Sequence, residues 1–220
     1  MVKNALILLS GGLDSLVSLG LVRKNYGTML ALTFDYGQKA VKDEIEASAK
    51  ICDYYKIYHK VIDLGWLKEI TATSLVSDRE VPTNISDYRE SMKAVWVPNR
   101  NGLFLNVAAC FADAEGYHDI IIGANKEEGQ TFPDNTIEFA NSITEEFKYS
   151  TLMKPQVIAP LINYSKNDIV EKALENEIPL ELVKSCYNGG NKHCGKCESC
   201  LRLRQALEYN GADKYINLLF

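Results

Sequence analysis

The sequence predicts an α/β fold in which a doubly wound parallel sheet carries helices on both faces. Short apolar runs typical of buried strands alternate with longer amphipathic stretches typical of helices, beginning with a strand–helix–strand–helix–strand series over residues 5–64. Such a series forms parallel strand pairs through right-handed crossovers. The 220 residues are enough for one domain of this kind with a small appendage.

The predicted elements follow one another along the chain. A Ser-x-x-Asp pattern at Ser165 and Asp168 resembles a capping box and predicts a helix start there. Two polar segments, residues 71–93 and 126–135, are expected to be loops, and the first is either a mobile flap over the site or a plain surface excursion. Strands are expected at residues 5–9, 29–34, 58–64, 119–123 and 157–160, and helices at about 15–24, 42–55, 99–114, 137–147 and 165–175.

The first strand runs into Ser-Gly-Gly-Leu-Asp-Ser at residues 10–15. A glycine turn between a strand and a helix exposes backbone N–H groups at the positive end of the helix dipole, where phosphate binds well. Gly11 and Gly12 allow an anion to approach the backbone closely. The turn contains no lysine, so it is not the phosphate-binding loop of the common NTPases. The alternative is a helix that is merely capped by Ser or Asp.

Composition limits the function classes. The net charge of −5 argues against a general nucleic-acid binder, so RNA or DNA partners are not expected. The sequence shows neither a secretion signal nor an apolar run of the ~18 residues that a membrane span needs, so a soluble, cytoplasmic protein is expected.

Four of the six cysteines crowd into the last part of the chain as Cys186-x7-Cys194-x2-Cys197-x2-Cys200. In a cytoplasmic chain this spacing favours a metal, and four thiolates complete a tetrahedral, structural zinc site. An iron–sulfur cluster and no metal at all are the alternatives. His193 is expected to be a neighbour rather than a ligand. Cys52 and Cys110 lie in apolar helical patterns and are expected in the core.

The hexapeptide at residues 10–15 resembles the PP-loop of the ATP pyrophosphatase superfamily. Further segments in the same order narrow the resemblance to the 7-cyano-7-deazaguanine synthase family, over about residues 5 to 209. The most specific part combines Cys-Tyr-Asn-Gly at residues 186–189 with the cysteine triplet. The other segments are Phe34-Asp35-Tyr36-Gly37-Gln38, Val97-Pro98-Asn99-Arg100-Asn101 and Ser165-Lys166.

The resemblance implies a Rossmann-like fold, a zinc site and a homodimer. Because the chain after about Pro179 is too short for a core of its own, we expect an ATP-binding α/β domain at residues 1–180 and a zinc-binding, helical appendage at 181–220, packed on the same domain. The resemblance also implies the reaction: 7-carboxy-7-deazaguanine, ammonia and ATP with Mg²⁺ give the 7-cyano product, preQ0. The acid is activated by transfer of AMP, ammonia gives the amide, and a second activation allows dehydration to the nitrile. This chemistry needs positioning and charge stabilisation more than a side-chain nucleophile.

The resemblance also assigns roles to individual residues. Asp14 is expected to help hold Mg²⁺, Lys166 to neutralise phosphate charge, and Arg100 to bind the substrate carboxylate or a phosphate; these three are the expected catalytic residues. ATP is expected to contact Leu9, Ser10, Gly11, Gly12, Leu13, Asp14, Ser15, Leu16, Phe34, Gly123 and Lys166. The acid substrate is expected to contact Tyr36, Gln38, Arg100, Asn101, Asn125, Pro133 and Asp134.

One segment departs from the family pattern. Where the family has Ser-Gly-Tyr-Pro-Asp-Cys-Arg, this chain keeps Pro133-Asp134 but has Phe132 for the tyrosine and Asn135-Thr136 for Cys-Arg. A divergent ligase that joins the same acid to another amine, including a protein terminus, is therefore the first alternative function. A non-catalytic nucleotide-binding zinc scaffold is the second, and the intact hexapeptide argues against it.

Overall fold

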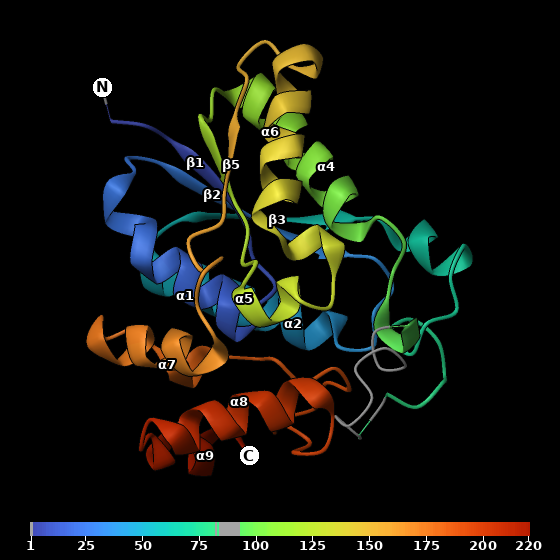
Figure 1. Ribbon diagram of the computed structural model, residues 1–220, viewed down its shortest axis with the longest axis vertical. Coiled ribbons are helices and arrows are strands. Elements are labelled where there is room, and N and C mark those ends of the chain that lie inside the picture. The colour runs from blue at the N-terminus through green and yellow to red at the C-terminus, as the bar shows by residue number, and fades with distance from the viewer. Residues whose placement is uncertain (1, 82, 84–92) are drawn as a thin grey trace.

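The computed structural model describes residues 2–81, 83 and 93–220. Within them, five parallel strands form one sheet in the order β3-β2-β1-β4-β5 (Figure 1). The predicted α/β fold class with a parallel sheet is confirmed. The strands are β1 (Ala5–Leu8), β2 (Met29–Asp35), β3 (Tyr58–Asp63), β4 (Asp119–Ile121) and β5 (Gln156–Ile158). The α-helices are α1 (Leu13–Val22), α2 (Val41–Tyr55), α4 (Arg100–Glu115), α5 (Lys126–Gly129), α6 (Ile137–Ser150), α7 (Lys166–Glu175), α8 (Glu198–Tyr209) and α9 (Asp213–Leu219).

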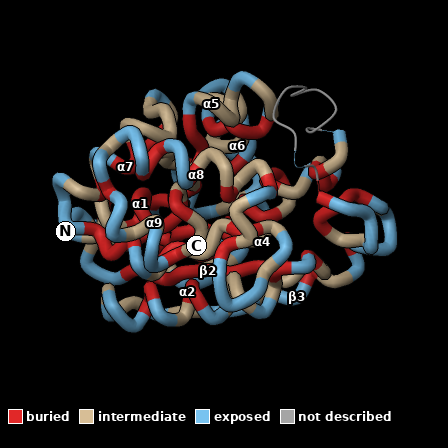
Figure 2. The backbone as a smooth tube through the Cα atoms, turned by 90° about the horizontal axis from the view of Figure 1, so that it is seen from below, coloured by how far each residue is buried: buried red, intermediate tan, exposed pale blue. Residues whose placement is uncertain are grey.

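Side-chain alternation along β1 divides the core into two layers. Ala5 and Ile7 belong to the cluster beneath α1, α2 and α7, whereas Leu6 and Leu8 belong to the cluster beneath α4 and α6. A strand that is covered on both faces has no polar positions, which is why β1 is a continuous apolar run. Figure 2 shows the same pattern in β2, which is buried over most of its length, whereas the edge strand β3 is mostly exposed.

The direction of winding reverses at β1. The chain first adds β2 and β3 on one side of it, then returns to place β4 and β5 on the other. The connection that follows β1 leads to β2 on one side, and the connection that follows β4 leads to β5 on the other. A crevice therefore opens between them, at the carboxyl ends of β1 and β4. The Ser10–Ser15 turn follows β1 and Gly123 follows β4, so both lie at this crevice.

The C-terminal helices do not form a core of their own. Leu203 and Leu207 of α8 and Leu219 of α9 share one buried cluster with Leu16 of α1 and Ile169 of α7. Figure 1 shows α8 and α9 beside α7, below the sheet. Helices α8 and α9 are therefore held by the same apolar layer that covers one face of the sheet.

The segment at 126–135 differs from its expectation as a loop. Asn125 accepts hydrogen bonds from the backbone N–H groups of Glu127 and Glu128 at 3.1 and 3.0 Å, and so caps the short helix α5. A single turn of 3₁₀ helix, Pro133–Asn135, follows it. A one-turn helix is too short to produce a visible hydrophobic period, so the sequence pattern could not reveal it.

Two further expectations meet different outcomes. Cys52 is buried as predicted, but Cys110 lies on the exposed side of α4 and its prediction as a core residue was wrong. The reason is that the buried face of α4 runs through Leu105, Ala108 and Ala112. Part of the flap expected at residues 71–93, namely residues 82 and 84–92, lies outside the described residues.

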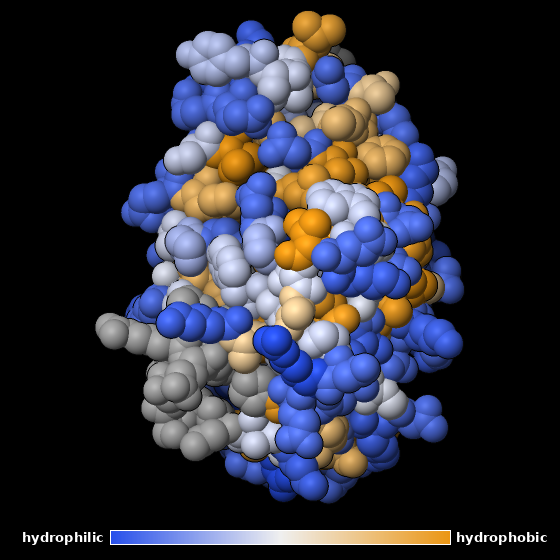
Figure 3. Space-filling model, turned by 90° about the vertical axis from the view of Figure 1, so that its right-hand side faces the viewer, coloured by the Kyte–Doolittle hydropathy of each residue, from blue (hydrophilic) through white to orange (hydrophobic). Residues whose placement is uncertain are grey.

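The surface combines polar and apolar side chains. On the face drawn in Figure 3, apolar residues are interspersed with hydrophilic ones. Tyr58 and Val61 on the edge strand β3 and Trp66 just after it are large exposed apolar residues. No helix in the described part of the chain is long and apolar enough to cross a membrane.

The start of α7 provides a test of local stability. Asp168 donates its backbone N–H to Ser165 Oγ at 3.3 Å, and Ser165 returns its own N–H to Asp168 Oδ2 at 2.8 Å, which confirms the predicted capping box. Ser165→Ala should lower the free energy of unfolding by about 1 kcal/mol, because it leaves a helix N–H without its partner. Urea unfolding measures this change.

Ser142→Ala is the matched control. Ser142 is exposed within α6, where alanine is a better helix former, so this variant should be neutral or slightly stabilising. Equal midpoints and slopes for both variants would show that the cap contributes nothing.

Candidate active site

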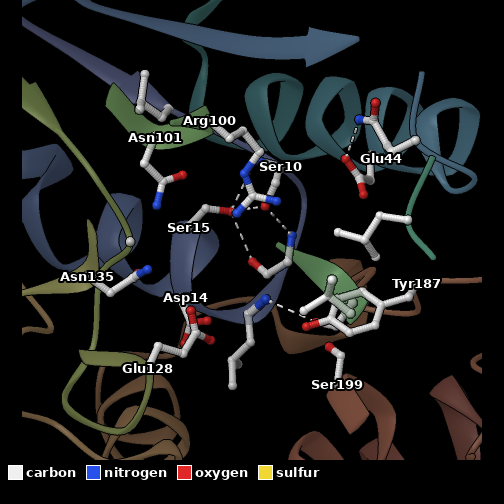
Figure 4. A pocket seen from close by; sticks show the side chains of 18 of the residues that line it. Ser10, Asp14, Ser15, Glu44, Arg100, Asn101, Glu128, Asn135, Tyr187 and Ser199 are labelled. Atoms are coloured by element: carbon white, nitrogen blue, oxygen red, sulfur yellow. Dashed lines mark hydrogen bonds between the residues drawn. The ribbon is translucent and has the colours of Figure 1, made fainter. Parts of the chain in front are cut away.

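A cavity of about 270 Å³ opens at the carboxyl ends of β1 and β4. Its walls come from the Ser10–Ser15 turn, the start of α4, the segment 128–135, Lys166 at the start of α7, and residues 184–203. Figure 4 shows labelled side chains from these segments directed toward one space, with Asp14 and Glu128 on one side and Tyr187 and Ser199 on another. Segments that are far apart in sequence therefore meet at the topological reversal of the sheet.

The Ser10–Ser15 turn aims its backbone N–H groups at hydroxyl oxygens. Ser10 N–H points to Ser15 Oγ at 3.3 Å, Gly12 N–H to Ser10 Oγ at 3.3 Å, and Leu13 N–H to Ser185 Oγ at 3.2 Å. These bonds are at the long end of the normal range. The geometry lets the oxygens of an anion take their place at the positive end of α1.

Two glycines are required by close packing around this turn. Gly11 has a φ of +75°, and a Cβ there would lie 2.8 Å from Ala47 Cβ of α2. A Cβ on Gly123 would lie 3.0 Å from the backbone nitrogen of Ser15, at the first turn of α1. Both positions therefore allow the turn to pack closely against its neighbours, and Gly123 lets the end of β4 lie close to the first turn of α1.

Lys166 is the centre of a partly buried ion cluster. Its Nζ lies 2.5 Å from Asp14 Oδ2 and 2.9 Å from Glu128 Oε1. Burial by itself would lower the pKa of Lys166, but the two carboxylates outweigh it and raise that pKa, so the ammonium stays charged. Burial raises the pKa of Asp14 to about 6 despite the opposing charge of Lys166. Asp14 Oδ1 is buried and has no hydrogen-bond partner among the described residues.

A second ion cluster links α5 to α8. Arg202 of α8 contacts Glu127 Oε2 at 3.4 Å through Nη1 and Glu198 Oε1 at 2.6 Å through Nη2. Glu127 and Glu128 are adjacent, and both are oriented by the cap that Asn125 provides. The short helix α5 thus presents Glu128 to Lys166 and the preceding residue, Glu127, to Arg202.

Arg100 occupies the opposite part of the cavity, at the first position of α4. Its Nη1 donates to the Tyr36 hydroxyl at 3.2 Å, and the guanidinium lies 5.6 Å from the centre of the Tyr36 ring. Burial raises the pKa of Asp134, and the positive charge of Arg100 opposes that rise. Asn101 and Asn135 also line the cavity.

Two pairs of stacked aromatic rings also border the cavity. Phe34 and Phe104 have ring centroids 4.0 Å apart at an angle of 5°. Trp96 and Phe132 have centroids 6.0 Å apart at an angle of 7°. All four residues line the cavity, so it offers flat apolar surfaces beside its charged groups.

Most of the residues predicted for the site reach the cavity, and four do not line it. Gly11 packs on α2, Leu16 is fully buried in the core, Asn125 caps α5, and Pro133 is exposed at the start of its 3₁₀ turn. The predicted residues that line the cavity are Leu9, Ser10, Gly12, Leu13, Asp14, Ser15, Phe34, Tyr36, Gln38, Arg100, Asn101, Gly123, Asp134 and Lys166.

Several residues of the cavity wall were not predicted from the sequence. The adjacent acids of α5 gave a weak signal, because they follow a predicted strand, but an acidic pair is also common on any surface. The residues near the cysteines gave none, because that segment was interpreted only as a metal site. The residues that were not predicted include Glu44, Trp96, Glu128, Lys184, Ser185, Tyr187, Glu198, Ser199 and Arg202, whereas Phe132 and Asn135 belong to the altered segment that the sequence had singled out.

The four C-terminal cysteines come together beside the cavity. The Sγ atoms of Cys186, Cys194, Cys197 and Cys200 lie within 4.8 Å of one another, and those of Cys194 and Cys200 are 3.8 Å apart. Sulfurs on a tetrahedron around zinc, at Zn–S distances of about 2.3 Å, would be about 3.8 Å apart. This cluster could therefore bind zinc.

His193 lies next to the cluster but is engaged elsewhere. Its Nε2 accepts the Ser185 N–H at 3.0 Å, and its Nδ1 lies 3.1 Å from the Leu219 carbonyl oxygen. Burial lowers the pKa of His193, in keeping with a neutral ring that accepts at Nε2 and donates at Nδ1. Both nitrogens are thus occupied by the backbone, as expected for a neighbour rather than a ligand.

Comparison with solved structures identifies the fold. The chain is similar to NMN synthetase from Francisella tularensis, with a TM-score of 0.51 and 15% identity over 96% of this chain and 85% of that one. It is also similar to a 4-thiouridine synthetase solved with RNA and bound ATP, with a TM-score of 0.53 and 21% identity over 98% of this chain and 53% of that one. At these identities the likeness concerns the fold alone.

Comparison of sequences identifies the family. The chain is 50% identical over 210 residues to the 7-cyano-7-deazaguanine synthase of Carboxydothermus hydrogenoformans, covering 93% of this chain and 98% of the relative. It is 43% identical over 231 residues to the enzyme of the same name from Methanocaldococcus jannaschii, covering 97% and 99%. The family model for the queuosine biosynthesis protein QueC matches residues 4–211. The chain, with its parallel α/β sheet and its four-cysteine cluster, belongs to the QueC family of enzymes.

Proposed function

We propose that this chain makes 7-cyano-7-deazaguanine from 7-carboxy-7-deazaguanine, ammonia and ATP. Membership of the QueC family and the names of the relatives support the product. The observation that carries the proposal for this chain is the meeting of two charged regions in one cavity. The Ser10–Ser15 turn with Lys166 is suited to phosphates, and Arg100 is suited to a carboxylate.

The proposed reaction has two activations. The carboxylate oxygen attacks the α-phosphorus of ATP, which forms an acyl-adenylate and releases pyrophosphate. Ammonia displaces AMP to give the amide and a proton. The amide oxygen then attacks a second ATP with loss of pyrophosphate and a proton, and departure of AMP with the remaining N–H proton leaves the nitrile. Each activation converts a poor oxide or hydroxide leaving group into AMP.

The chain's contribution is to position the phosphates and to stabilise their charge. The backbone N–H groups of Ser10, Gly12 and Leu13 now donate to serine hydroxyl oxygens. When ATP is bound, they would donate instead to oxygens of the departing pyrophosphate. Lys166 would neutralise the charge that develops there. Phe34 and the other predicted residues of the turn, including Gly11 and Leu16, would shape the ATP side of the cavity directly or by packing.

Asp14 and Glu128 are suited to hold Mg²⁺. Carboxylate oxygens are preferred ligands of this ion, and Asp14 Oδ1 is a buried oxygen in need of a partner. Bound Mg²⁺ would supply charge neutralisation for the phosphates. Asn125 would act through α5, by fixing the position of Glu128.

Arg100 would bind the carboxylate of the acid. Its guanidinium is held by Tyr36, and Gln38 supports that region by accepting the Tyr36 N–H at 2.9 Å. Asn101 and Asp134 would contact polar edges of the same substrate, and Pro133 would hold the turn that presents Asp134.

We assign zinc to the cysteine cluster and a structural role to the ion. Four cysteines leave no open coordination position for a substrate. An iron–sulfur cluster would hold the sulfurs further apart because several irons lie between them. The division at residue 180, the homodimer and the cytoplasmic location stay predictions, and the net charge of −5 still argues against nucleic acid as a partner.

The central experiment follows the products. Purified protein is given ATP, Mg²⁺, 7-carboxy-7-deazaguanine and ammonium, and the mixture is analysed by mass spectrometry. The nitrile and two AMP per nitrile are expected. AMP with no nitrile would indicate a ligase for another amine, which the altered segment at Asn135 and Thr136 makes the alternative function. Nucleotide binding without any ATP cleavage would indicate a non-catalytic scaffold.

Lys166→Met tests the phosphate side of the cavity. Turnover should fall at least 100-fold, or by about 2.7 kcal/mol or more in transition-state stabilisation, because the charge on the departing pyrophosphate loses its partner. Lys172→Met is the matched control from the same helix, where the lysine pairs only with Glu175 among the described residues. Melting curves accompany the kinetics, and Lys166→Arg should retain part of the activity. Wild-type turnover in Lys166→Met would remove Lys166 from the mechanism.

Metal analysis and chelation test the cysteine cluster. We expect about one zinc per chain in a colourless protein, and a lower melting temperature in Cys197→Ser, because metal binding and local folding are coupled. Cys110→Ser is the matched control, since that thiol is exposed and outside the cluster. A brown preparation that contains iron would contradict zinc, and equal melting temperatures would contradict a structural site.

A further inference from the structure

The proposed reaction removes every proton from a single nitrogen atom. Ammonia carries three hydrogens and a nitrile nitrogen carries none, so this atom loses one proton when the amide forms and two more before the nitrile is complete. A positioned side chain that accepts such protons is most often a histidine or a carboxylate. No histidine among the described residues lines the cavity. A carboxylate of the cavity wall is therefore the group most suited to accept them.

One carboxylate of the wall is not engaged by a cation. Five carboxylates of the described residues line the cavity, and three of them form ion pairs with a lysine or an arginine. A fourth, Asp134, accepts a hydrogen bond from the side chain of the next residue at 3.0 Å. The fifth is Glu44, in the first turn of α2, which within the described part of the chain forms no ion pair. The three in ion pairs are Asp14, Glu128 and Glu198.

A chain of hydrogen bonds fixes Glu44 relative to Arg100. Arg100 Nη1 donates to the Tyr36 hydroxyl at 3.2 Å, and the Tyr36 N–H donates to Gln38 Oε1 at 2.9 Å. Gln38 Nε2 then donates to Glu44 Oε2 at 2.8 Å and to the Phe34 carbonyl at 2.9 Å. Both donors and the oxygen of this buried amide are used, so its orientation is fixed. One network therefore positions the group proposed to bind the substrate carboxylate and a second carboxylate beside it.

The environment of Glu44 suits a proton acceptor. Gln38 occupies Oε2, whereas Oε1 accepts no hydrogen bond from the described residues. Burial raises the pKa of Glu44, and the Gln38 bond and the charge of Arg100 oppose that rise. In Figure 4, Glu44 and Arg100 lie in the upper part of the view, whereas Asp14 and Glu128 lie in the lower part. The side chain is only partly buried, so a proton that it accepts can pass on to water.

We propose that Glu44 is the general base that takes protons from the substrate nitrogen. This inference rests on the proposed function and adds a catalytic residue to it. Ammonia forms a bond to the acyl carbon, the bond from that carbon to AMP breaks with its electron pair on AMP, and one N–H proton passes to Glu44. A second N–H proton leaves when the amide oxygen is adenylated. Glu44 takes the last one as the nitrile forms and the second AMP departs with its electron pair.

Single-turnover rapid quench separates activation from proton transfer. Excess enzyme is mixed with ATP, Mg²⁺, 7-carboxy-7-deazaguanine and ammonium, so that pyrophosphate reports the activation, and amide plus nitrile report the nitrogen step. Glu44→Gln keeps the shape of the side chain and an acceptor for Gln38, but it cannot take a proton. Its pyrophosphate formation should stay within about twofold of the wild type, while amide formation falls at least about 100-fold. Glu44→Asp should retain part of the activity.

Hydroxylamine in place of ammonium gives a second readout. After attack its nitrogen is more acidic than that of ammonia, so water can take the proton, and Glu44→Gln should lose less than about tenfold in hydroxamate formation. When the amide itself is supplied, nitrile formation should again fall at least about 100-fold. Glu46→Gln is the matched control on α2, where the carboxylate is exposed and pairs with Lys50, and it should react like the wild type. Melting curves accompany both variants.

The outcomes separate the base from the reaction. Wild-type amide formation in Glu44→Gln would overturn the base and leave the proposed reaction intact, with water or the leaving phosphate as the acceptor. Equal losses of pyrophosphate and amide, or of hydroxamate and amide, would also overturn it, because they indicate a role in binding the acid. A wild type that forms no acid-dependent pyrophosphate would refute the proposed reaction and the base with it. A wild type that makes amide but no nitrile, beside a Glu44→Gln variant that makes neither, would refute the nitrile product and support the base.

Discussion

The reversal of the sheet at β1 is the constraint on which the site depends. Because β1 has β2 on one side and β4 on the other, the turn that follows it meets no crossover and remains open. Gly123, at the end of β4, allows the backbone there to approach the first turn of α1. The polar side chains that line the cavity come from several segments of the chain and meet at the carboxyl ends of β1 and β4. The arrangement of these two strands therefore sets the relative positions of the side chains.

The segment that carries the cysteines is part of the site rather than a separate module. Its backbone contacts the turn directly, since Lys184 N–H donates to the Gly11 carbonyl at 2.7 Å and Ser185 Oγ accepts the Leu13 N–H. α8 begins beside Cys197 and carries Arg202 to Glu127. A metal that fixes the start of α8 would therefore also fix one wall of the cavity.

The sequence was sufficient for the sheet, for most helices and for the glycine turn between β1 and α1, because these features have local signatures in apolar periodicity and glycine placement. It also predicted the four cysteines as one cluster. It could not predict Glu128 beside Lys166, or Ser185 beside Leu13, because these contacts join residues more than thirty positions apart that carry ordinary surface chemistry. The short helix α5 was hidden for a different reason: one turn has no period to detect.

The charge of the cluster around Lys166 has a consequence for the form of nucleotide that the proposed reaction would use. Lys166 is paired with both Asp14 and Glu128. This cluster of three side chains therefore holds one positive and two negative charges, and its net charge is negative. A bare triphosphate would meet repulsion there in spite of the lysine. A nucleotide that arrives already complexed with a divalent cation brings the missing positive charge with it. The carboxylates that keep Lys166 charged would thus disfavour the uncomplexed nucleotide. Selectivity for the metal-complexed nucleotide would then follow from charge rather than from shape.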